Sequence, residues 1–166
     1  MSGGSSSPAI RDFADSDADA VNRLAVAAFA PFATHYSDWT AMAANLGRMS
    51  ALSTTGEVIV AESGGRIAGA VAYVPPGASK AAFFDVAWPI IRMLVVDPDV
   101  RGKGIGRALT DACIERARRD GAKLIALHTS PIMSVALPMY LRMGFVRLRD
   151  APPVFGVDYA VYTKAL

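Results

Sequence analysis

Residues 89–129 restrict the fold more than any other part of the sequence. The run "PIIRMLVV" (89–96) is almost continuously apolar, which is typical of a strand buried on both faces of a sheet. A glycine-rich turn follows, then apolar residues at three- and four-residue spacing, then the strand-like run "KLIALHT" (123–129). A strand, a helix and a strand in this order predict a right-handed crossover with the two strands parallel.

The helix predicted inside this crossover has one apolar face and a clear end. Its apolar positions are Ile105, Ala108, Leu109, Ala112, Cys113 and Ala117. Arginines fill its last turn, where they suit the negative end of the helix dipole, and Gly121 is a natural terminator. We therefore expect Cys113 to be buried and chemically inert.

The flanking segments predict further helices and antiparallel strands. Residues 9–13 favour a short strand, and residues 18–52 favour two consecutive helices that we expect Ser16 and Ser37 to cap. Residues 57–61 and 66–74 flank "ESGG" and predict a hairpin that turns at Gly64 and Gly65. After a short helix at 135–143, residues 145–148 and 158–166 supply the closing antiparallel strands. The expected fold class is α/β (α+β), with a mixed, mostly antiparallel sheet and helices on both faces.

Composition limits the classes of protein that this chain can represent. With 166 residues and 52% hydrophobic content, it fits one domain, expected at residues 8–166 after a tail at 1–7. A net charge of +2 is too small to indicate nucleic acid or a membrane as partner. A single cysteine excludes an internal disulfide and a cysteine-built zinc site, and we expect no bound metal. No signal-peptide pattern opens the sequence, so we expect a cytoplasmic protein.

The turn in "VVDPDVRGKGIGRAL" (95–109) has the composition of an anion site. Glycines allow close approach of a backbone to a ligand, and the amides at the start of a helix attract anions. The Walker spacing Gly-x-x-x-x-Gly-Lys-Ser/Thr is absent. The dinucleotide spacing Gly-x-Gly-x-x-Gly also fails, because Arg107 stands where the third glycine should be.

The spacing that does fit is Arg-x-x-Gly-x-Gly, formed by Arg101, Gly104 and Gly106 directly after a strand and before a helix. It resembles the acetyl-CoA-binding motif of the GNAT family, the GCN-related N-acetyltransferases. The run "LPMYLRMGF" (137–145) is similar to the Tyr-x-x-x-Gly-Phe ending of that family. The resemblance extends over about residues 9–166.

The resemblance implies acetyl-CoA as co-substrate, held where the two parallel strands splay apart. Backbone groups of Leu94 and Val96, unpaired because of the splay, would bind the pantetheine arm. The pyrophosphate would lie on the turn between residues 102 and 107. The expected cofactor-binding residues are Leu94, Val95, Val96, Arg101, Gly102, Lys103, Gly104, Ile105, Gly106 and Arg107. Met133 stands where relatives often have an asparagine, so one contact to the coenzyme differs.

The resemblance also implies catalytic residues. Tyr140 matches the tyrosine that donates a proton to the departing sulfur; packing beside Gly144 and Phe145 is the alternative. The strand at 89–96 lacks the glutamate that serves as base in several relatives. His128, twelve residues before Tyr140, stands where N-terminal acetyltransferases place a glutamate. It is equally well explained as a base or as a hydrogen-bonding residue at a strand end.

The resulting expectation is an N-acetyltransferase that transfers acetyl directly, in a ternary complex, to a primary amine of a small molecule or a peptide N-terminus. The expected acceptor pocket contains His35, Tyr36, Trp39, Phe84 and Asp85. The alternatives are a non-catalytic acyl-CoA sensor and a basic nucleic-acid-binding domain. The acceptor, the preferred acyl length, regulation and the oligomeric state are left open, with a homodimer as one option.

Overall fold

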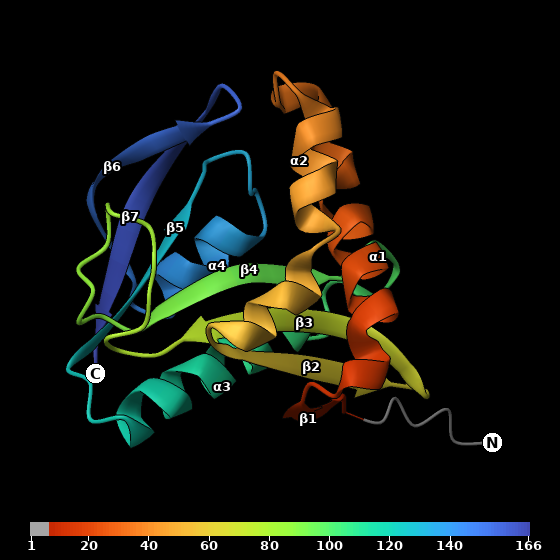
Figure 1. Ribbon diagram of the computed structural model, residues 1–166, viewed down its shortest axis with the longest axis horizontal. Helices are drawn as coiled ribbons and strands as arrows, with labels where there is room; N and C mark the ends of the chain where they lie inside the picture. The colour runs from red at the N-terminus through yellow and green to blue at the C-terminus, as the bar shows by residue number, and fades with distance from the viewer. Residues whose placement is uncertain (1–6) are drawn as a thin grey trace.

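The computed structural model describes residues 7–166, so residues 1–6 of the expected tail lie outside the described part. A seven-stranded sheet crosses the molecule in the order β1-β2-β3-β4-β5-β7-β6 (Figure 1). The strands are β1 (Ala9–Asp12), β2 (Glu57–Ser63), β3 (Arg66–Val74), β4 (Ile90–Val96), β5 (Leu124–Thr129), β6 (Val146–Val154) and β7 (Val157–Ala165). Every neighbouring pair is antiparallel except β4 and β5. The predicted α/β class and the mixed sheet are confirmed.

Helices cover both faces of this sheet (Figure 1). The α-helices are α1 (Ala18–Phe29), α2 (Trp39–Leu46), α3 (Ile105–Arg119) and α4 (Ala136–Arg142). Short 3-10 helices occupy Asp15–Asp17, Ala30–His35, Met49–Thr54 and Pro98–Val100. Buried residues of α1 and α2 form one core cluster, and those of α3 and α4 form another. Each face of the sheet therefore has its own core.

Two predicted helix caps are wrong by one residue. Helix α1 begins at Ala18 after a 3-10 turn, and its N-cap is Asp17 rather than Ser16. The Asp17 carboxylate accepts the backbone N–H of Ala14 at 2.9 Å and binds Arg11. Helix α2 is capped by Asp38 rather than Ser37, because the Asp38 carboxylate accepts the N–H of Ala41 at 3.0 Å. At α2 the Asp38 carboxylate satisfies a helix amide, whereas at α1 Asp17 makes no such bond and places its charge at the positive end of the dipole.

The parallel strands β4 and β5 pair at one end only. Ile90 lies opposite Ala126, whose N–H donates to the Pro89 carbonyl at 3.0 Å, and no further register pair follows within the described residues. From Ile91 onward, the β5-facing edge of β4 has no strand partner. The splay expected from the family resemblance is therefore present.

A bulge in β4 accompanies this separation. Ala70 pairs with Val95 and Ala72 with Arg92, so two residues of β4, Met93 and Leu94, face one residue of β3. Met93 has φ of 56°, in the left-handed region that non-glycine residues rarely adopt. Such a conformation costs about 1–3 kcal/mol and persists only where the surrounding structure imposes it. The bulge lies in the part of β4 that has no partner on β5.

Within residues 7–166, no helix combines the length and the apolar character that crossing a membrane requires.

The packing of α3 on β3 yields a test of the fold. A Cβ at Gly69 would lie 2.7 Å from Ile105 Cγ2 and 2.9 Å from Leu109 Cδ1, which is closer than real Cβ contacts. We expect Gly69→Ala to lower the free energy of unfolding by about 1–3 kcal/mol, because α3 must move away from the sheet. Urea denaturation measures this, and an unchanged midpoint would contradict the packing described for α3.

Candidate active site

A cavity of about 310 Å³ lies between the second half of β4, the glycine turn and α4. We call it the turn cavity. Leu94, Val95 and Val96 of β4 form one wall, and Met139 and Arg142 of α4 form another. Its third wall is the turn itself, from Arg101 to Arg107, except for Lys103. The separation of β4 from β5 thus leaves a lined cavity, and nine of the ten predicted cofactor-binding residues line it.

Unpaired backbone amides are concentrated at this cavity. Gly102 and Gly104 have φ of 84° and 78°, which glycine adopts without strain, and Gly104 is the N-cap of α3. The first hydrogen bond of α3 runs from the Ala108 N–H to the Gly104 carbonyl at 3.0 Å. The amides of Ile105, Gly106 and Arg107 precede it and have no partner inside the helix. Together with the helix dipole, they favour an anion at this place.

Side-chain charge at the turn cavity is positive. Arg101, Arg107 and Arg142 line it, and its lining contains no carboxylate. Arg101 also donates from Nη2 to the Ala28 carbonyl at 2.9 Å, which ties the turn to the end of α1. Lys103 is exposed beside the turn. The turn cavity therefore has the charge and the amides that a diphosphate requires.

Gly106 forms part of the cavity wall without a side chain. A Cβ on Gly106 would lie 3.6 Å from Met139 Sδ, 3.7 Å from Val96 and 3.8 Å from Leu94. These are ordinary contacts, so the protein has room for a methyl group there. The methyl group would occupy space between β4 and α4 that the glycine leaves open to a ligand.

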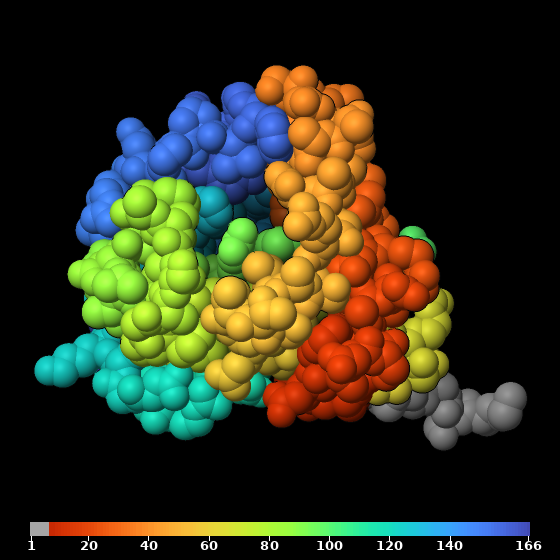
Figure 2. All heavy atoms as spheres, viewed as in Figure 1, coloured from red at the N-terminus to blue at the C-terminus, as the bar shows by residue number. Residues whose placement is uncertain are grey.

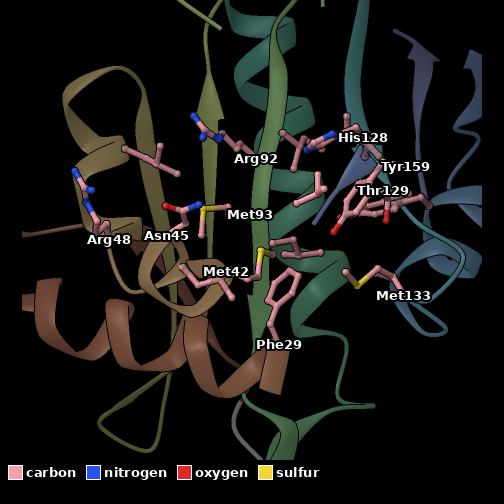
Figure 3. A pocket seen from close by; sticks show the side chains of 18 of the residues that line it. Phe29, Met42, Asn45, Arg48, Arg92, Met93, His128, Thr129, Met133 and Tyr159 are labelled. Atoms are coloured by element: carbon pink, nitrogen blue, oxygen red, sulfur yellow. The ribbon is translucent and has the colours of Figure 1, made fainter. Parts of the chain in front are cut away.

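A larger cavity of about 520 Å³ adjoins the first, and we call it the central cavity. Phe29, Leu94, Met133 and Ala136 line both cavities, which therefore meet at these residues. Figure 2 shows the hollow between α2, the loop at 75–89 and the β6–β7 hairpin, with green atoms of β4 on its floor. Figure 3 shows side chains from both sides of this hollow, including Met42, Arg92 and His128. Its lining is mainly apolar, with a few polar groups, as is typical of small-molecule sites.

Tyr140 reaches the central cavity from the opposite face of the sheet. Its side chain packs in the α3–α4 core, 5% exposed, with its ring edge-on to Phe145 at a centroid distance of 5.5 Å. It nevertheless lines the central cavity, which requires the opening between β4 and β5. Burial, with a smaller contribution from Cys113, raises the pKa of Tyr140 well above its usual range. The hydroxyl therefore keeps its proton at neutral pH.

His128 lies in the wall of the same cavity, among aromatic rings. Its ring centroid is 5.1 Å from Phe83, 5.9 Å from Phe84 and 5.0 Å from Tyr159. Burial and the charge of Arg92 lower the pKa of His128 to about 4, so the ring is neutral at pH 7. Nδ1 is buried without a hydrogen-bond partner among the described residues. Nε2 is therefore the ring nitrogen that remains for contact with a ligand in the cavity.

The loop at residues 75–89 positions these rings. The Lys80 ammonium donates to the carbonyls of Pro75, Ala78 and Val86 at 3.3, 2.7 and 2.8 Å. Arg149 of β6 donates to the Phe83 carbonyl at 2.7 Å. These bonds hold Phe83 and Phe84 against His128.

None of the five residues expected in the acceptor pocket belongs to the lining of the central cavity, and two of them contact residues that do. Tyr36 shares a 2.6 Å hydrogen bond with the hydroxyl of Tyr159, which does line the cavity, and Phe84 packs on His128. His35 and Asp85 are exposed, and the Trp39 ring lies 6.3 Å from Tyr36. Tyr36 and Phe84 thus support the cavity wall from behind.

Five polar residues of the central cavity were missed by the sequence analysis. They are Asn45, Arg48, Arg92, Thr129 and Tyr159. Arg92 had a detectable signal, because it is the one cation inside the apolar run at 89–96. Asn45 and Arg48 had none, because Asn45 lies within α2 and Arg48 just after it, and neither belongs to a motif.

Residues 7–166 contain no group of three or more His, Cys, Asp or Glu side chains placed to hold a metal ion. Cys113 is buried, and burial raises the pKa of its thiol, which suits a packing role.

Known proteins share this architecture. A GNAT structure from Rhodopseudomonas palustris, titled as a GCN5-related N-acetyltransferase, superimposes with a TM-score of 0.74 at 24% identity and covers 97% of each chain. The yncA structure from Salmonella typhimurium, titled with its cofactor acetyl-CoA, reaches 0.68 at 20% identity, over 96% of this chain and 94% of that one. At such identities the likeness shows the fold.

Sequence comparisons point the same way. N-acetyltransferase 8F1 from Rattus norvegicus is 34% identical over 101 residues, which are 58% of this chain and 42% of that protein. Matches to curated relatives thus span less than half of each relative's length. The model of the acetyltransferase (GNAT) family matches residues 19–145. The chain belongs to the GNAT family of acetyltransferases.

Proposed function

We propose that this protein is an acetyl-CoA-dependent N-acetyltransferase that transfers acetyl directly to a primary amine in a ternary complex. One observation carries the proposal: β4 and β5 pair only at Ile90 and Ala126, and the opening beyond joins an arginine-lined turn to a second cavity. A long ligand with an anionic end fits the first cavity, and a small acceptor fits the second. The two would meet at Leu94, Met133 and Ala136.

The chain's own groups account for cofactor binding. The amides of residues 105–107 and the guanidinium groups of Arg107 and Arg142 would hold the pyrophosphate. The unpaired edge of β4 at Leu94 and Val96 would hydrogen-bond the amides of the pantetheine arm, as a neighbouring strand would. Acetyl-CoA supplies an acetyl group already activated as a thioester.

Transfer requires an N–C bond to form, a C–S bond to break and one proton to move from nitrogen to sulfur overall. Tyr140 is the proposed proton donor to the departing sulfur, because its raised pKa keeps the hydroxyl protonated in the cavity. His128, neutral with a pKa near 4, is a weak base for an ammonium ion. We therefore assign His128 Nε2 to accept a hydrogen bond from an amine that arrives neutral. The amine's proton then leaves through the open cavity to solvent, and Tyr140 regains a proton from solvent by the same route.

Binding of CoA is tested by thermal shift together with Gly106→Ala. Ligand at 100 times its dissociation constant should stabilise the wild-type protein by about 2.7 kcal/mol. Without CoA, Gly106→Ala should be as stable as wild type or more so, by about 0.4–1 kcal/mol, because alanine suits a helix. With CoA, we expect the variant to lose most of the shift, since the methyl group enters the proposed arm site. A full shift in the variant would contradict this site.

The role of Tyr140 is tested by free-thiol release from acetyl-CoA with an amine panel. Tyr140→Phe keeps the ring packing and should lower kcat by roughly 10²-fold or more, with KM for acetyl-CoA little changed. Tyr162→Phe is the matched control, because Tyr162 is buried in the same core and lines neither cavity. Equal turnover in both variants would leave Tyr140 a packing residue. Binding of CoA without thiol release for any amine would instead support the sensor alternative.

The burial of His128 predicts a pH dependence of stability. Because its folded pKa is about 4, below its usual 6.5, the folded state takes up this proton later than the unfolded chain. The contribution of neutral His128 to the free energy of unfolding is complete above pH 6.5 and is lost as the pH falls to 4. Relative to His128→Leu, wild-type protein should lose about 2 kcal/mol across this window, allowing for partial exposure. Urea unfolding from pH 7 to pH 4 measures this, with His35→Leu as the exposed-histidine control; parallel curves for wild type and His128→Leu would refute it.

A further inference from the structure

The central cavity contains two arginines and no acid among its lining residues. Arg48 follows α2, and Arg92 projects from the middle of β4. The remaining polar lining groups, Asn45, His128, Thr129, Tyr140 and Tyr159, are neutral amides, hydroxyls or an imidazole whose pKa is lowered to about 4. The lining therefore carries two positive charges that nothing in the cavity wall neutralises.

These two arginines differ from most others in the protein. Within residues 7–166, eight arginines bind a carboxylate or a backbone carbonyl through the side chain: Arg11, Arg66, Arg101, Arg116, Arg118, Arg119, Arg147 and Arg149. The described contacts give no such partner to Arg23, Arg48, Arg92, Arg107 and Arg142. Four of these five line the two cavities. Unpaired guanidinium groups are thus concentrated where ligands would bind.

The positions of the two arginines agree with a ligand that spans the central cavity. In Figure 3, Phe29 and Met133, which border the turn cavity, lie at the lower edge. Arg48 and Arg92 lie toward the upper left of that view. The acetyl group would arrive beside Phe29 and Met133, so we place the acceptor amine there. A second group of the acceptor can then extend toward the arginines.

The chemistry of the arginines selects what that second group is. A guanidinium fork binds a carboxylate through two parallel hydrogen bonds, whereas two positive charges in one cavity disfavour an acceptor that is only cationic. One carboxylate would leave a net charge of +1 beside the amine, which favours the neutral, reactive amine. A strong base would also produce a neutral amine, and His128 is a weak base. The positive charge of the arginines therefore supplies part of that effect.

We propose that the acceptor is a small amine that also carries a carboxylate, an amino-acid-like compound, with Arg92 and Arg48 binding the carboxylate. The apolar lining from Met42, Leu46 and Leu52 suits an aliphatic or aromatic side chain on that compound. A cavity of about 520 Å³ is large enough for it. The proposal rests on the acetyltransferase activity proposed above.

The test compares matched acceptors that differ only in the carboxylate. L-Leucine is measured against L-leucinamide and 3-methylbutylamine, and L-phenylalanine against L-phenylalaninamide and 2-phenylethylamine, by thiol release. The readout is the ratio of kcat/KM for the acid to kcat/KM for its amide, so that differences in amine pKa cancel between enzyme variants. We expect Arg92→Gln to lower this ratio at least tenfold and Arg48→Gln to lower it in the same direction. Arg92→Lys should restore part of it.

The control is Arg23→Gln, which removes an exposed arginine of α1 that lines neither cavity and should leave the ratio unchanged. Equal ratios in wild type, Arg92→Gln and Arg48→Gln would overturn the inference, as would wild-type activity on amides and simple amines alone. A preference for O-phosphoethanolamine over every amino acid would overturn the proposal that the arginines bind a carboxylate. It would indicate that they bind a phosphate group instead. If CoA binds but no amine of any class is acetylated, the proposed function fails and this inference falls with it.

Discussion

The early separation of β4 from β5 is the constraint on which the site depends. Two parallel strands normally satisfy each other's backbone groups, and leaving an edge unpaired inside a protein is costly. Here pairing stops after Ile90 and Ala126, and the bulge at Met93 follows within the unpaired part of β4. This opening exposes backbone groups and lets Tyr140 on one face line a cavity that opens on the other. A closed sheet would have kept these groups in separate cores.

Arginines that line the cavities differ from the other arginines in their pairing. Most arginines that line neither cavity are paired, as in the network in which Arg116 and Arg119 bind Glu57, and such pairs stabilise the surface of the fold. Five arginines line the cavities, and among the described residues only Arg101 of these has a side-chain partner; the linings there contain no acid. The repulsion between these like charges is offset if anionic ligands occupy both cavities. The electrostatics thus connect the turn, which suits a diphosphate, with the central cavity, which suits an anionic acceptor.

Local patterns in the sequence predicted the elements well and their details less well. The apolar run at 89–96, the glycine turn and the periodicity of 105–119 indicated β4 and α3, because each pattern depends only on neighbouring residues. The caps failed by one residue, because Ser37 stands beside Asp38, whose carboxylate accepts a helix amide, and because a 3-10 turn at Asp15–Asp17 precedes α1. The bulge at Met93 had no signal, because its backbone conformation is imposed by packing around β4 and not by the methionine.

The sequence by itself determined the order of strands and helices, the family resemblance and the glycine turn before α3, since glycine spacing and apolar periodicity are local properties. Only the tertiary structure decided which side chains line the central cavity. Arg48 and Arg92 are 44 positions apart, and His128 and Tyr159 come from other strands, so only the folded chain brings them to one cavity. It also decided the protonation of His128, because the aromatic rings and Arg92 that lower its pKa come from separate segments. The physical reason is that burial and electric field depend on distance in space, which the order of residues does not specify.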